Sequence, residues 1–261
     1  MPTINDILRT IEAVAPLSLQ ESYDNAGLQI GDASAECTGA IICVDVTPET
    51  VSEAAARGCN LIISHHPLIF KGLKNITGAT LQQRAAILAI KHDIAIYAAH
   101  TNLDNAPTGV SHTLAASLGI EKVSTLEPKA YDPTTGSGAI GDLNPPVSPV
   151  ELVDRVKAAC SSPVVRCSTP PHHAISRVAV CGGSGSFLIN EAIKGGAQAF
   201  VTSDVKYHDF VDHGNDIFII DIGHYESEKC TKQIFYHIVS EKFPNFALYY
   251  SELEKNPINY L

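Results

Sequence analysis

No run of about 18 or more apolar residues, the length that a membrane-spanning helix needs, occurs in this sequence. The first residues, MPTINDILRTIEAV, also lack the basic segment, apolar core and small-residue cleavage site of a signal peptide. Apolar side chains recur there at helical spacing instead, from Ile4 to Val14. We therefore expect an amphipathic first helix and neither a membrane span nor export.

Basic side chains are scarce relative to acidic ones: 18 Lys and Arg stand against 28 Asp and Glu, and the formal net charge is −10. Nucleic acids and acidic membranes require a cationic surface, so this balance disfavours general binding to either. An acidic chain can still bind an anionic substrate if it supplies local positive charge, and metal ions would supply it.

CxxC motifs are also missing, and the number of cysteines, seven, is odd. Several cysteines lie in apolar, strand-like runs, such as Cys43 in AIICVDV and Cys181 in RVAVCGG. This pattern predicts buried, reduced thiols in a cytoplasmic protein.

Short apolar runs alternate with helical patterns along the chain. Continuous apolarity over about six residues indicates strands that are covered on both faces. The alternation predicts an α/β fold of layered sheets with mainly parallel pairing. The expected strands are 39–46, 59–64, 94–99, 177–182, 198–203 and 216–221, and the expected helices are 48–57, 79–92, 108–118, 149–160, 187–195 and 224–242.

Segment 127–149 is rich in Pro, Gly and polar residues and has no helical period. It predicts a connection between two α/β lobes, 1–126 and 127–261, with a short strand at GAIGDL. The two lobes resemble each other only in pattern, so the sequence does not establish a duplication.

Two adjacent histidines, His65 and His66, directly follow the apolar run CNLIIS and precede Pro67. Open α/β sheets place their ligands at the carboxyl ends of strands. The backbone can bend there, so each imidazole could serve a different metal ion; a chance pair that ends a strand is the alternative. A second pair, His172 and His173, lies in TPPHHAIS with no buried strand before it, and we expect solvated loop histidines there.

Two further strand ends carry possible ligands. The run IAIYAA leads into His100 and Asp104; the Asp104 carboxylate could bind a cation, or could cap the helix expected from residue 108. The run DIFIID leads into His224 and Glu228, which share one helix face at a spacing of four. For Glu228, a favourable position near a helix start is the alternative.

Together these strand ends predict a metal centre. Mixed nitrogen and oxygen ligands suit zinc, iron or manganese, and five ligands exceed what one tetrahedral site needs, so two divalent ions are expected. Ions that share a carboxylate and a water would lie about 3.5–4 Å apart. The candidate ligands are His65, His66, Asp104, His224 and Glu228.

Two other strand ends hold weaker candidates. In TSDVKYHDF, four side chains could support the ligands or contact substrate: Asp204, Lys206, Tyr207 and His208. A solvated helix face explains Lys206 and Asp209 equally well. The segment CGGSGS (181–186) could cradle phosphate at a helix start, but it matches neither the P-loop nor the dinucleotide pattern, which favours a plain tight turn.

Four motifs, SHHPLIF (64–70), AAHTNLD (98–104), TSDVKYHDF (202–210) and DIGHYESE (221–228), together with SYDNAGLQIGD (22–32), resemble the Nif-three-like family of GTP cyclohydrolase 1 type 2 homologues. The resemblance spans nearly the whole chain. It implies a dinuclear metal centre with the five ligands named above, two related α/β lobes and a toroidal homohexamer. Segment 127–176 is too short for the extra domain that some members carry.

The resemblance implies a metal-dependent hydrolase in which activated water opens the imidazole ring of GTP, or cleaves a related nucleotide or phosphate ester. His100 or Glu228 would move protons, and Lys74, Lys206 and Tyr207 would contact the substrate. A non-enzymatic hexamer that stores or delivers metal, or that serves as a scaffold, is the alternative.

Overall fold

The computed structural model describes residues 1–261 and forms two compact units. The first unit consists of 1–103 and 231–257, and the second of 104–230 and 258–261. This division differs from the expected boundary at 126/127, because the last long helix and the final strand belong to the layers of the first unit. Two contiguous lobes cannot describe a chain that leaves a unit and later returns to it.

The first unit contains a five-stranded sheet in the order β1-β4-β3-β2-β11. The central strands β2, β3 and β4 are parallel and buried along their whole length, β11 is parallel to β2, and β1 is antiparallel to β4. Their bounds are β1 Gly27–Ile30, β2 Ala40–Cys43, β3 Leu61–Ser64, β4 Ala95–Ala98 and β11 Leu248–Tyr250. The continuous apolar runs therefore did indicate strands covered on both faces.

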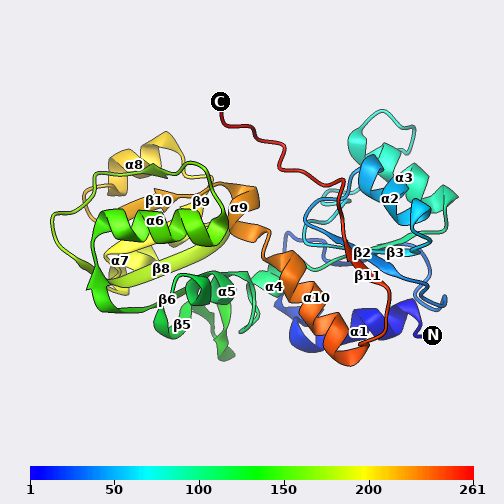
Figure 1. Cartoon of the computed structure of the whole chain (residues 1–261), viewed down its shortest axis with the longest axis horizontal. Helices are drawn as coiled ribbons and strands as arrows, with labels where there is room; N and C mark the ends of the chain where they lie inside the picture. The colour runs from blue at the N-terminus through cyan, green and yellow to red at the C-terminus, as the bar shows by residue number, and fades with distance from the viewer. The chain divides into compact units, whose positions relative to one another are not determined.

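Helices α2 (Pro48–Ala56) and α3 (Leu81–Lys91) cover one face of this sheet, and α1 (Ile4–Val14) and α10 (Thr231–Lys242) cover the other (Figure 1). The apolar stripe predicted for α1 is buried from Ile4 to Ile11. Capping boxes begin α1 at Thr3 and α2 at Thr47, as the sequence favours at helix starts. A short 3₁₀ helix, η1 (Leu17–Leu19), follows α1.

The second unit contains a six-stranded sheet in the order β5-β6-β8-β9-β10-β7. Only β8, β9 and β10 are parallel to one another; the remaining pairs are antiparallel, so this sheet is mixed. The bounds are β5 Glu121–Lys129, β6 Asp132–Val147, β7 Arg166–Cys167, β8 Ile175–Ser184, β9 Ala199–Ser203 and β10 Phe218–Asp221.

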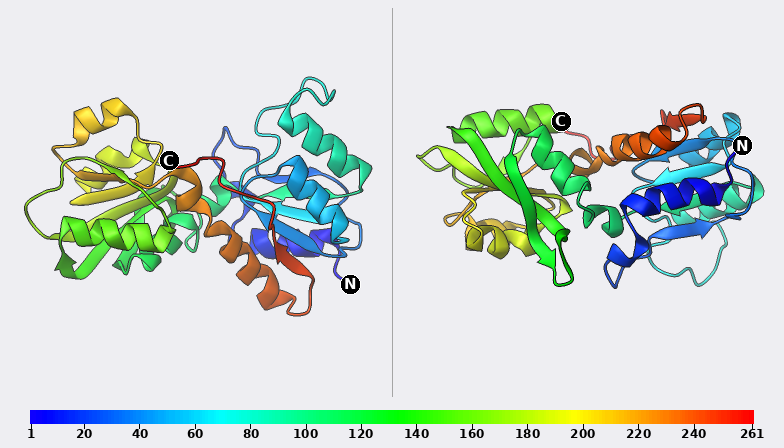
Figure 2. Two further views of the ribbon diagram at one scale, coloured as in Figure 1. Left: turned by 45° about the horizontal axis from the view of Figure 1, so that its top comes forward. Right: turned by 90° about the horizontal axis from the view of Figure 1, so that it is seen from below.

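Strands β5 and β6 form a long hairpin where the sequence predicted an irregular connection with one short strand (Figure 2). The glycines that suggested a loop allow close approach instead. A Cβ on Gly136 would lie 2.1 Å from the carbonyl oxygen of Glu127, and one on Gly138 would lie 2.9 Å from Leu188 Cδ1. Glycine inside a strand often marks such crowding or a bulge, and the hairpin has both.

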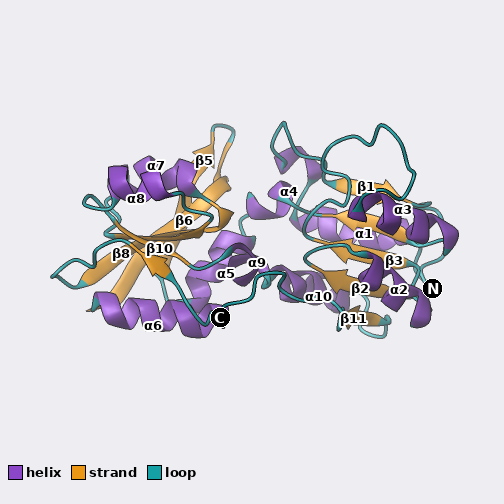
Figure 3. Cartoon of the chain, turned by 90° about the horizontal axis from the view of Figure 1, so that it is seen from above, coloured by secondary structure: helices purple, strands orange, loops and turns teal.

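Helices α5 (Val110–Ser117) and α6 (Pro149–Cys160) pack on one face of the second sheet, and α7 (Ile189–Lys194) and α8 (Tyr207–His213) on the other (Figure 3). The short helices are α4 (Thr101–Asp104), α9 (His224–Glu228) and the 3₁₀ helix η2 (Ser186–Leu188). The single helix expected over 224–242 is thus two helices, α9 and α10. No helix in the chain combines the length and apolarity that crossing a membrane requires.

Candidate metal centre

In the first unit, three neighbouring strands end at the same level. The register aligns Cys43 of β2 with Ser64 of β3, and Ser64 with Ala98 of β4. Two residues beyond this aligned row, the chain carries Asp45, His66 and His100. Parallel pairing therefore brings side chains that are far apart in the sequence to one edge of the sheet.

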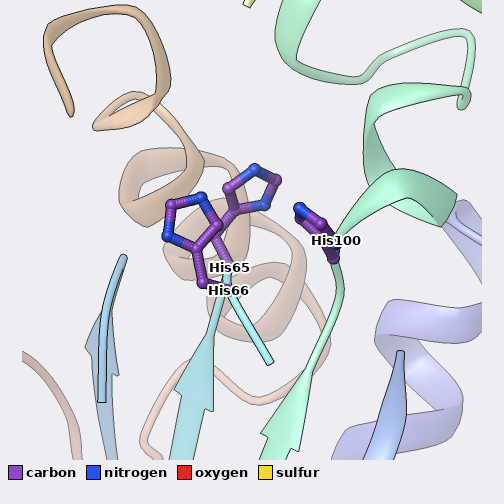
Figure 4. Close-up of side chains that lie close together, drawn as sticks. All are labelled: His65, His66 and His100. Atoms are coloured by element: carbon purple, nitrogen blue, oxygen red, sulfur yellow. The ribbon is translucent and has the colours of Figure 1, made fainter. Parts of the chain in front are cut away.

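The imidazoles of His65, His66 and His100 gather at this edge (Figure 4). Their ring centroids are 5.0 to 5.5 Å apart, and one ring nitrogen from each lies within 4.8 Å of the others. His65 and His66 do not point apart as neighbours in a strand would, because β3 ends at Ser64, whose hydroxyl donates a hydrogen bond to the His66 carbonyl.

Each of these imidazoles is held through Nδ1 by an oxygen. His65 Nδ1 lies 2.9 Å from the Ala99 carbonyl oxygen, and His66 Nδ1 lies 2.8 Å from Asp45 Oδ1. His100 Nδ1 lies 2.8 Å from Asp24 Oδ1. A carbonyl or ionised carboxylate oxygen only accepts hydrogen bonds, so Nδ1 carries the proton and Nε2 keeps its lone pair in the neutral ring. Metal-binding histidines show the same arrangement.

Asp24 is well placed to stay ionised. Its carboxylate is fully buried and also accepts hydrogen bonds from the amide and the hydroxyl of Thr101, at 3.0 and 2.5 Å. Burial alone would raise the pKa of Asp24, but the hydrogen bonds from His100 and Thr101 outweigh it and lower the pKa to about 2.

The second unit holds its own group at the ends of β9 and β10. His224 Nδ1 lies 2.6 Å from Asp204 Oδ2, and its Nε2 lies 2.9 Å from Glu228 Oε2. Asp204, directly after β9, takes a left-handed backbone conformation with φ 55°. Asp221, at the end of β10, accepts hydrogen bonds from the amides of Val205 and Gly223 and so fixes both strand ends.

Two carboxylates set the charge of His224. Burial of the ring opposes its charged form, but the hydrogen bonds and negative charges of Asp204 and Glu228 outweigh burial and raise the pKa of His224 to about 10. Both ring nitrogens of His224 therefore face carboxylate oxygens, Nδ1 that of Asp204 and Nε2 that of Glu228.

Gly183 makes room for Glu228. It adopts φ +64°, and a Cβ at this position would lie 2.1 Å from Glu228 Oε1. Its amide donates to the Ser227 hydroxyl, and its carbonyl accepts from the hydroxyls of Thr202 and Ser203. The CGGSGS segment is thus the end of β8 and a tight turn beside a candidate ligand, which agrees with the turn that its sequence favoured over a phosphate cradle.

Asp104 is the last residue of α4 and is half-buried. Burial raises the pKa of the Cys181 and Cys230 thiols, and the charges of Asp104 and Glu228 raise it further in both cases. The two carboxylates therefore lie near the same pair of thiols within the second unit. Cys181 is buried, as predicted for the cysteines of this chain, whereas Cys167 is exposed.

These donors fit divalent cations of the zinc, iron or manganese class. They combine imidazole nitrogens, oriented by carboxylate or carbonyl oxygens, with carboxylate oxygens. Two nitrogens on one zinc ion lie at most about 4.2 Å apart, since each is about 2.0–2.1 Å from it, and the ring nitrogens of the first unit, within 4.8 Å of one another, have a comparable spacing. His100 belongs to this group by position and is a third candidate imidazole ligand, although the five ligands predicted from the sequence did not include it.

The remaining predicted residues are more exposed. Lys74 lies in the exposed loop between β3 and α3, Lys206 precedes α8, and Tyr207 begins α8 with 75% of its surface exposed. His172 and His173 lie in an exposed loop, as predicted.

The sequence did not reveal Asp24 and Asp45 as partners of the histidines. Asp45 lies inside the apolar run 39–46, which predicts a strand throughout, and Asp24 is 76 residues from His100. The strand-end position that identified His66 would also have identified Asp45, because each lies two residues beyond its strand.

Comparison with known proteins agrees with this architecture. The Duf34/NIF3 (NGG1p interacting factor 3) family model matches residues 2–257. The chain belongs to this family. A Clostridium perfringens member named GTP cyclohydrolase 1 type 2 homolog is 35% identical over 226 residues, which cover 86% of each chain. A Clostridium acetobutylicum protein of the same name is 36% identical and covers 86% of this chain and 85% of its own.

Solved structures of the family have the same fold. The crystal structure of Staphylococcus aureus protein SA1388 has a TM-score of 0.91 at 29% identity and covers 100% of this chain and 99% of its own. A Bacillus cereus protein related to NIF3 has a TM-score of 0.91 at 25% identity, with the same coverage. Reduced HcgD from Methanocaldococcus jannaschii shares the fold at a TM-score of 0.82 and 23% identity, covering 97% of this chain and 98% of its own.

Proposed function

We propose that this protein binds two divalent cations and uses them to hydrolyse a nucleotide, with GTP as the first candidate. One observation carries the proposal: four imidazoles are each oriented through Nδ1 by an oxygen acceptor. The printed name of the curated relatives, GTP cyclohydrolase 1 type 2 homolog, supplies the candidate substrate. The proposed ligands are His65, His66, Asp104, His224 and Glu228.

Bound cations of this class supply an activated water molecule and stabilise negative charge that develops on the substrate. The chain's own residues would do the rest. Asp45 and the Ala99 carbonyl keep His66 and His65 in the tautomer that presents Nε2. Opening a purine ring with release of formate also needs a group that moves protons, and His100, whose Nδ1–H donates to ionised Asp24, is the proposed one.

The position of His100 beside the other two imidazoles also supports a role as a ligand. His100→Ala separates the two roles. If His100 moves protons, the variant keeps both metal ions and loses turnover by about 100-fold or more. If His100 is a ligand, the metal content itself falls, and proton transfer passes to another residue, with Glu228 as the remaining candidate.

The test of the main proposal combines metal analysis with a turnover assay. The protein is loaded with zinc, iron(II) or manganese, metal bound per chain is measured, and formate and phosphate release from GTP and other nucleotides is followed. We expect two ions per chain and a loss of both binding and turnover in His65→Ala. His172→Ala, which alters an exposed histidine of the other pair, is the matched control and should behave as the wild type. Turnover that survives His65→Ala would contradict the proposal.

A second candidate is a metal-binding homohexamer without catalytic activity, which would store or deliver metal. The surroundings of His66 favour it: a pocket of about 430 Å³ beside this ring is lined by two acidic side chains, Asp45 and Glu49, and one lysine, Lys255, while Glu254 in the same lining is paired with Lys232. Such a lining repels a triphosphate. Stoichiometric metal binding without release of formate or phosphate from any nucleotide would support this candidate.

Substrate contacts by Lys74, Lys206 and Tyr207 form part of the enzymatic proposal. If the two lysines bind phosphate groups, Lys74→Ala and Lys206→Ala should raise KM for GTP and leave metal content unchanged. A KM equal to that of the wild type in both variants would assign these exposed side chains to the solvated surface.

A further inference from the structure

The carboxyl-terminal segment of the first unit reaches the strand end that carries Asp45. Strand β11 runs parallel to β2, with Tyr250 paired with Ile42. The Ser251 amide still donates to the Ile42 carbonyl at 2.9 Å, but β11 itself ends at Tyr250. The amides of Val44 and Asp45, one step further along, therefore have no strand beside them on this side.

Glu254 takes the place of the missing strand. One carboxylate oxygen, Oε1, accepts hydrogen bonds from the amides of Val44 and Asp45, at 2.5 and 2.8 Å. The other oxygen lies 2.7 Å from Lys232 Nζ, and the Glu254 side chain is 2% exposed. A buried carboxylate that accepts from two amides and pairs with a lysine is a strong anchor for the backbone it holds.

The same backbone is fixed from its other side by the histidine segment. The amide of His65 donates to the Cys43 carbonyl at 3.2 Å, and the amide of His66 donates to the Val44 carbonyl at 2.9 Å. Residues 43–45 are therefore hydrogen-bonded on one side to the amides of His65 and His66 and on the other side to the carboxylate of Glu254. The Asp45 side chain, half exposed itself, is directed by this backbone to His66 Nδ1 at 2.8 Å.

The segment that carries Glu254 has an anchor of its own in α2. The carboxylate of Glu53 accepts hydrogen bonds from the Ser251 hydroxyl at 2.7 Å and from the Glu252 amide at 3.0 Å. The Ser251 hydroxyl in turn accepts from the Glu254 amide at 3.1 Å. Two buried acidic side chains thus join residues 251–254 to the body of the unit.

We propose that Glu254 is a positioning residue for the metal ligand His66 and acts through the backbone of Asp45. This inference rests on the proposed metal-binding function, in which His66 is a ligand. Replacement of residues that orient a ligand histidine typically lowers metal affinity by about 10–100-fold. Glu254 contacts the Asp45 backbone, whereas the Asp45 side chain itself contacts His66, so the effect of Glu254 on metal affinity should be at the lower end of that range.

The experiment measures Zn²⁺ affinity by competition with a chromophoric chelator in the wild type, Glu254→Ala, Asp45→Ala and the double variant. We expect each single variant to weaken binding by roughly 10-fold or more. Because Glu254 acts through Asp45, the double variant should bind no more weakly than Asp45→Ala alone. The visible spectrum of bound Co²⁺, which reports ligand geometry, should change in both single variants.

Two further variants guard against a general loss of stability. Glu254→Gln keeps an oxygen that accepts from both amides and should retain affinity within about threefold of the wild type, so it remains informative if Glu254→Ala fails to fold. Val239→Ala removes part of a fully buried side chain in α10 and makes no hydrogen bond to residues 43–45. It should lower the unfolding temperature without a change in Zn²⁺ affinity.

The outcomes separate this inference from the proposed function. The positioning role would be overturned if Glu254→Ala had the Zn²⁺ affinity and the Co²⁺ spectrum of the wild type. It would also be overturned if the losses of binding free energy in Glu254→Ala and Asp45→Ala were additive in the double variant. In either case, His66→Ala would still abolish binding and the proposed metal-binding function would stand. If His66→Ala also bound Zn²⁺ like the wild type, the proposed metal-binding function would fail, and the role of Glu254 with it.

Discussion

At the scale of single residues, acidic side chains determine how the histidines are presented. The histidines themselves could be predicted, because each follows an apolar run that reads plainly as a strand. Asp204 also follows such a run and was predicted as a possible supporting residue, but the partners Asp24 and Asp45 were not, since a pairing such as Asp24 with His100 depends on how distant segments fold together. Local pattern identifies candidate ligands, whereas tertiary structure decides what orients them.

Asp24→Asn tests whether an orienting carboxylate matters for metal affinity. Asparagine has the same shape, but it carries no charge, and its amide can donate a hydrogen bond to Nδ1, which favours the wrong tautomer of His100. If His100 is a ligand, Zn²⁺ affinity should fall by about 10–100-fold in a competition titration. If His100 moves protons, Zn²⁺ affinity should stay at the wild-type value and turnover should fall. Asp142→Asn, which alters a half-exposed ion pair with Arg177, is the control and should bind normally. Wild-type affinity together with wild-type turnover in Asp24→Asn would argue against a role for Asp24.

Gly183→Ala tests the space beside Glu228. The left-handed backbone costs a residue with a Cβ about 1–2 kcal/mol, and the new methyl would meet Glu228 Oε1, so that both stability and metal content should fall. Gly196→Ala is a matched control, because Gly196 has φ +74° and its nearest neighbour would be Arg177 Cδ at 3.9 Å. It should lose stability, measured by urea unfolding, and keep its metal content. If Gly183→Ala kept the same metal content as Gly196→Ala, the space beside Glu228 would not matter for metal binding.

At the scale of elements, the strands and helices that the sequence did predict lie mostly within two residues of observed ones, because continuous apolar runs and helical spacing are local signals. The β5–β6 hairpin could not, since Gly136 and Gly138 are used for close packing and their type alone indicates a loop. Strand β11 also had no local signature; its three residues are a strand because they pair with β2. Elements that depend on a distant partner are the ones that sequence patterns miss.

Glu53 links α2 to the segment after β11, and this link should weaken in acid. Burial alone would raise the pKa of Glu53, but hydrogen bonds from Ser251, Glu252 and Leu253 outweigh it and lower the pKa. The stabilisation is therefore present above the unfolded pKa of about 4.3 and is lost as the pH falls through the lower folded value. Glu53→Gln should cost about 1–3 kcal/mol of unfolding free energy at pH 7.

Urea unfolding at several pH values measures this effect. The difference between wild type and Glu53→Gln should shrink as the pH drops below about 4. Glu151→Gln, which alters an exposed pair with Arg155, should cost less than about 1 kcal/mol throughout. If the difference in unfolding free energy between the wild type and Glu53→Gln stayed constant down to pH 2, the charge of Glu53 would not stabilise the link.

At the scale of the whole molecule, the fold class was predictable and the division into units was not. Alternating strands and helices indicate α/β layers wherever they occur, but nothing local reveals that 231–257 complete the first unit. The Pro- and Gly-rich segment 127–149 looked like the boundary and is instead inside the second unit.

The homohexamer implied by the family resemblance is a property of this scale. Sedimentation equilibrium should give about six times the chain mass of 27.8 kDa for the metal-loaded protein. The His172→Ala variant should give the same mass, since that residue lies in an exposed loop. A species of one or two chains at micromolar concentration would contradict the hexamer. It would not bear on the proposed metal ligands, which all come from one chain.

The return of the chain to its first unit has a consequence for synthesis on the ribosome. The β2 edge of the first sheet stays open until β11 and Glu254 are made, after residues 104–230 have emerged. At about 5–20 residues per second this takes roughly 6–25 s, during which a nascent chain presents an unpaired strand edge of the kind that promotes aggregation. Most of the first unit is therefore synthesised early, but its sheet can be completed only after residues 231–257 have been made. Chaperones that cover the open strand edge during this interval should raise the yield of folded protein.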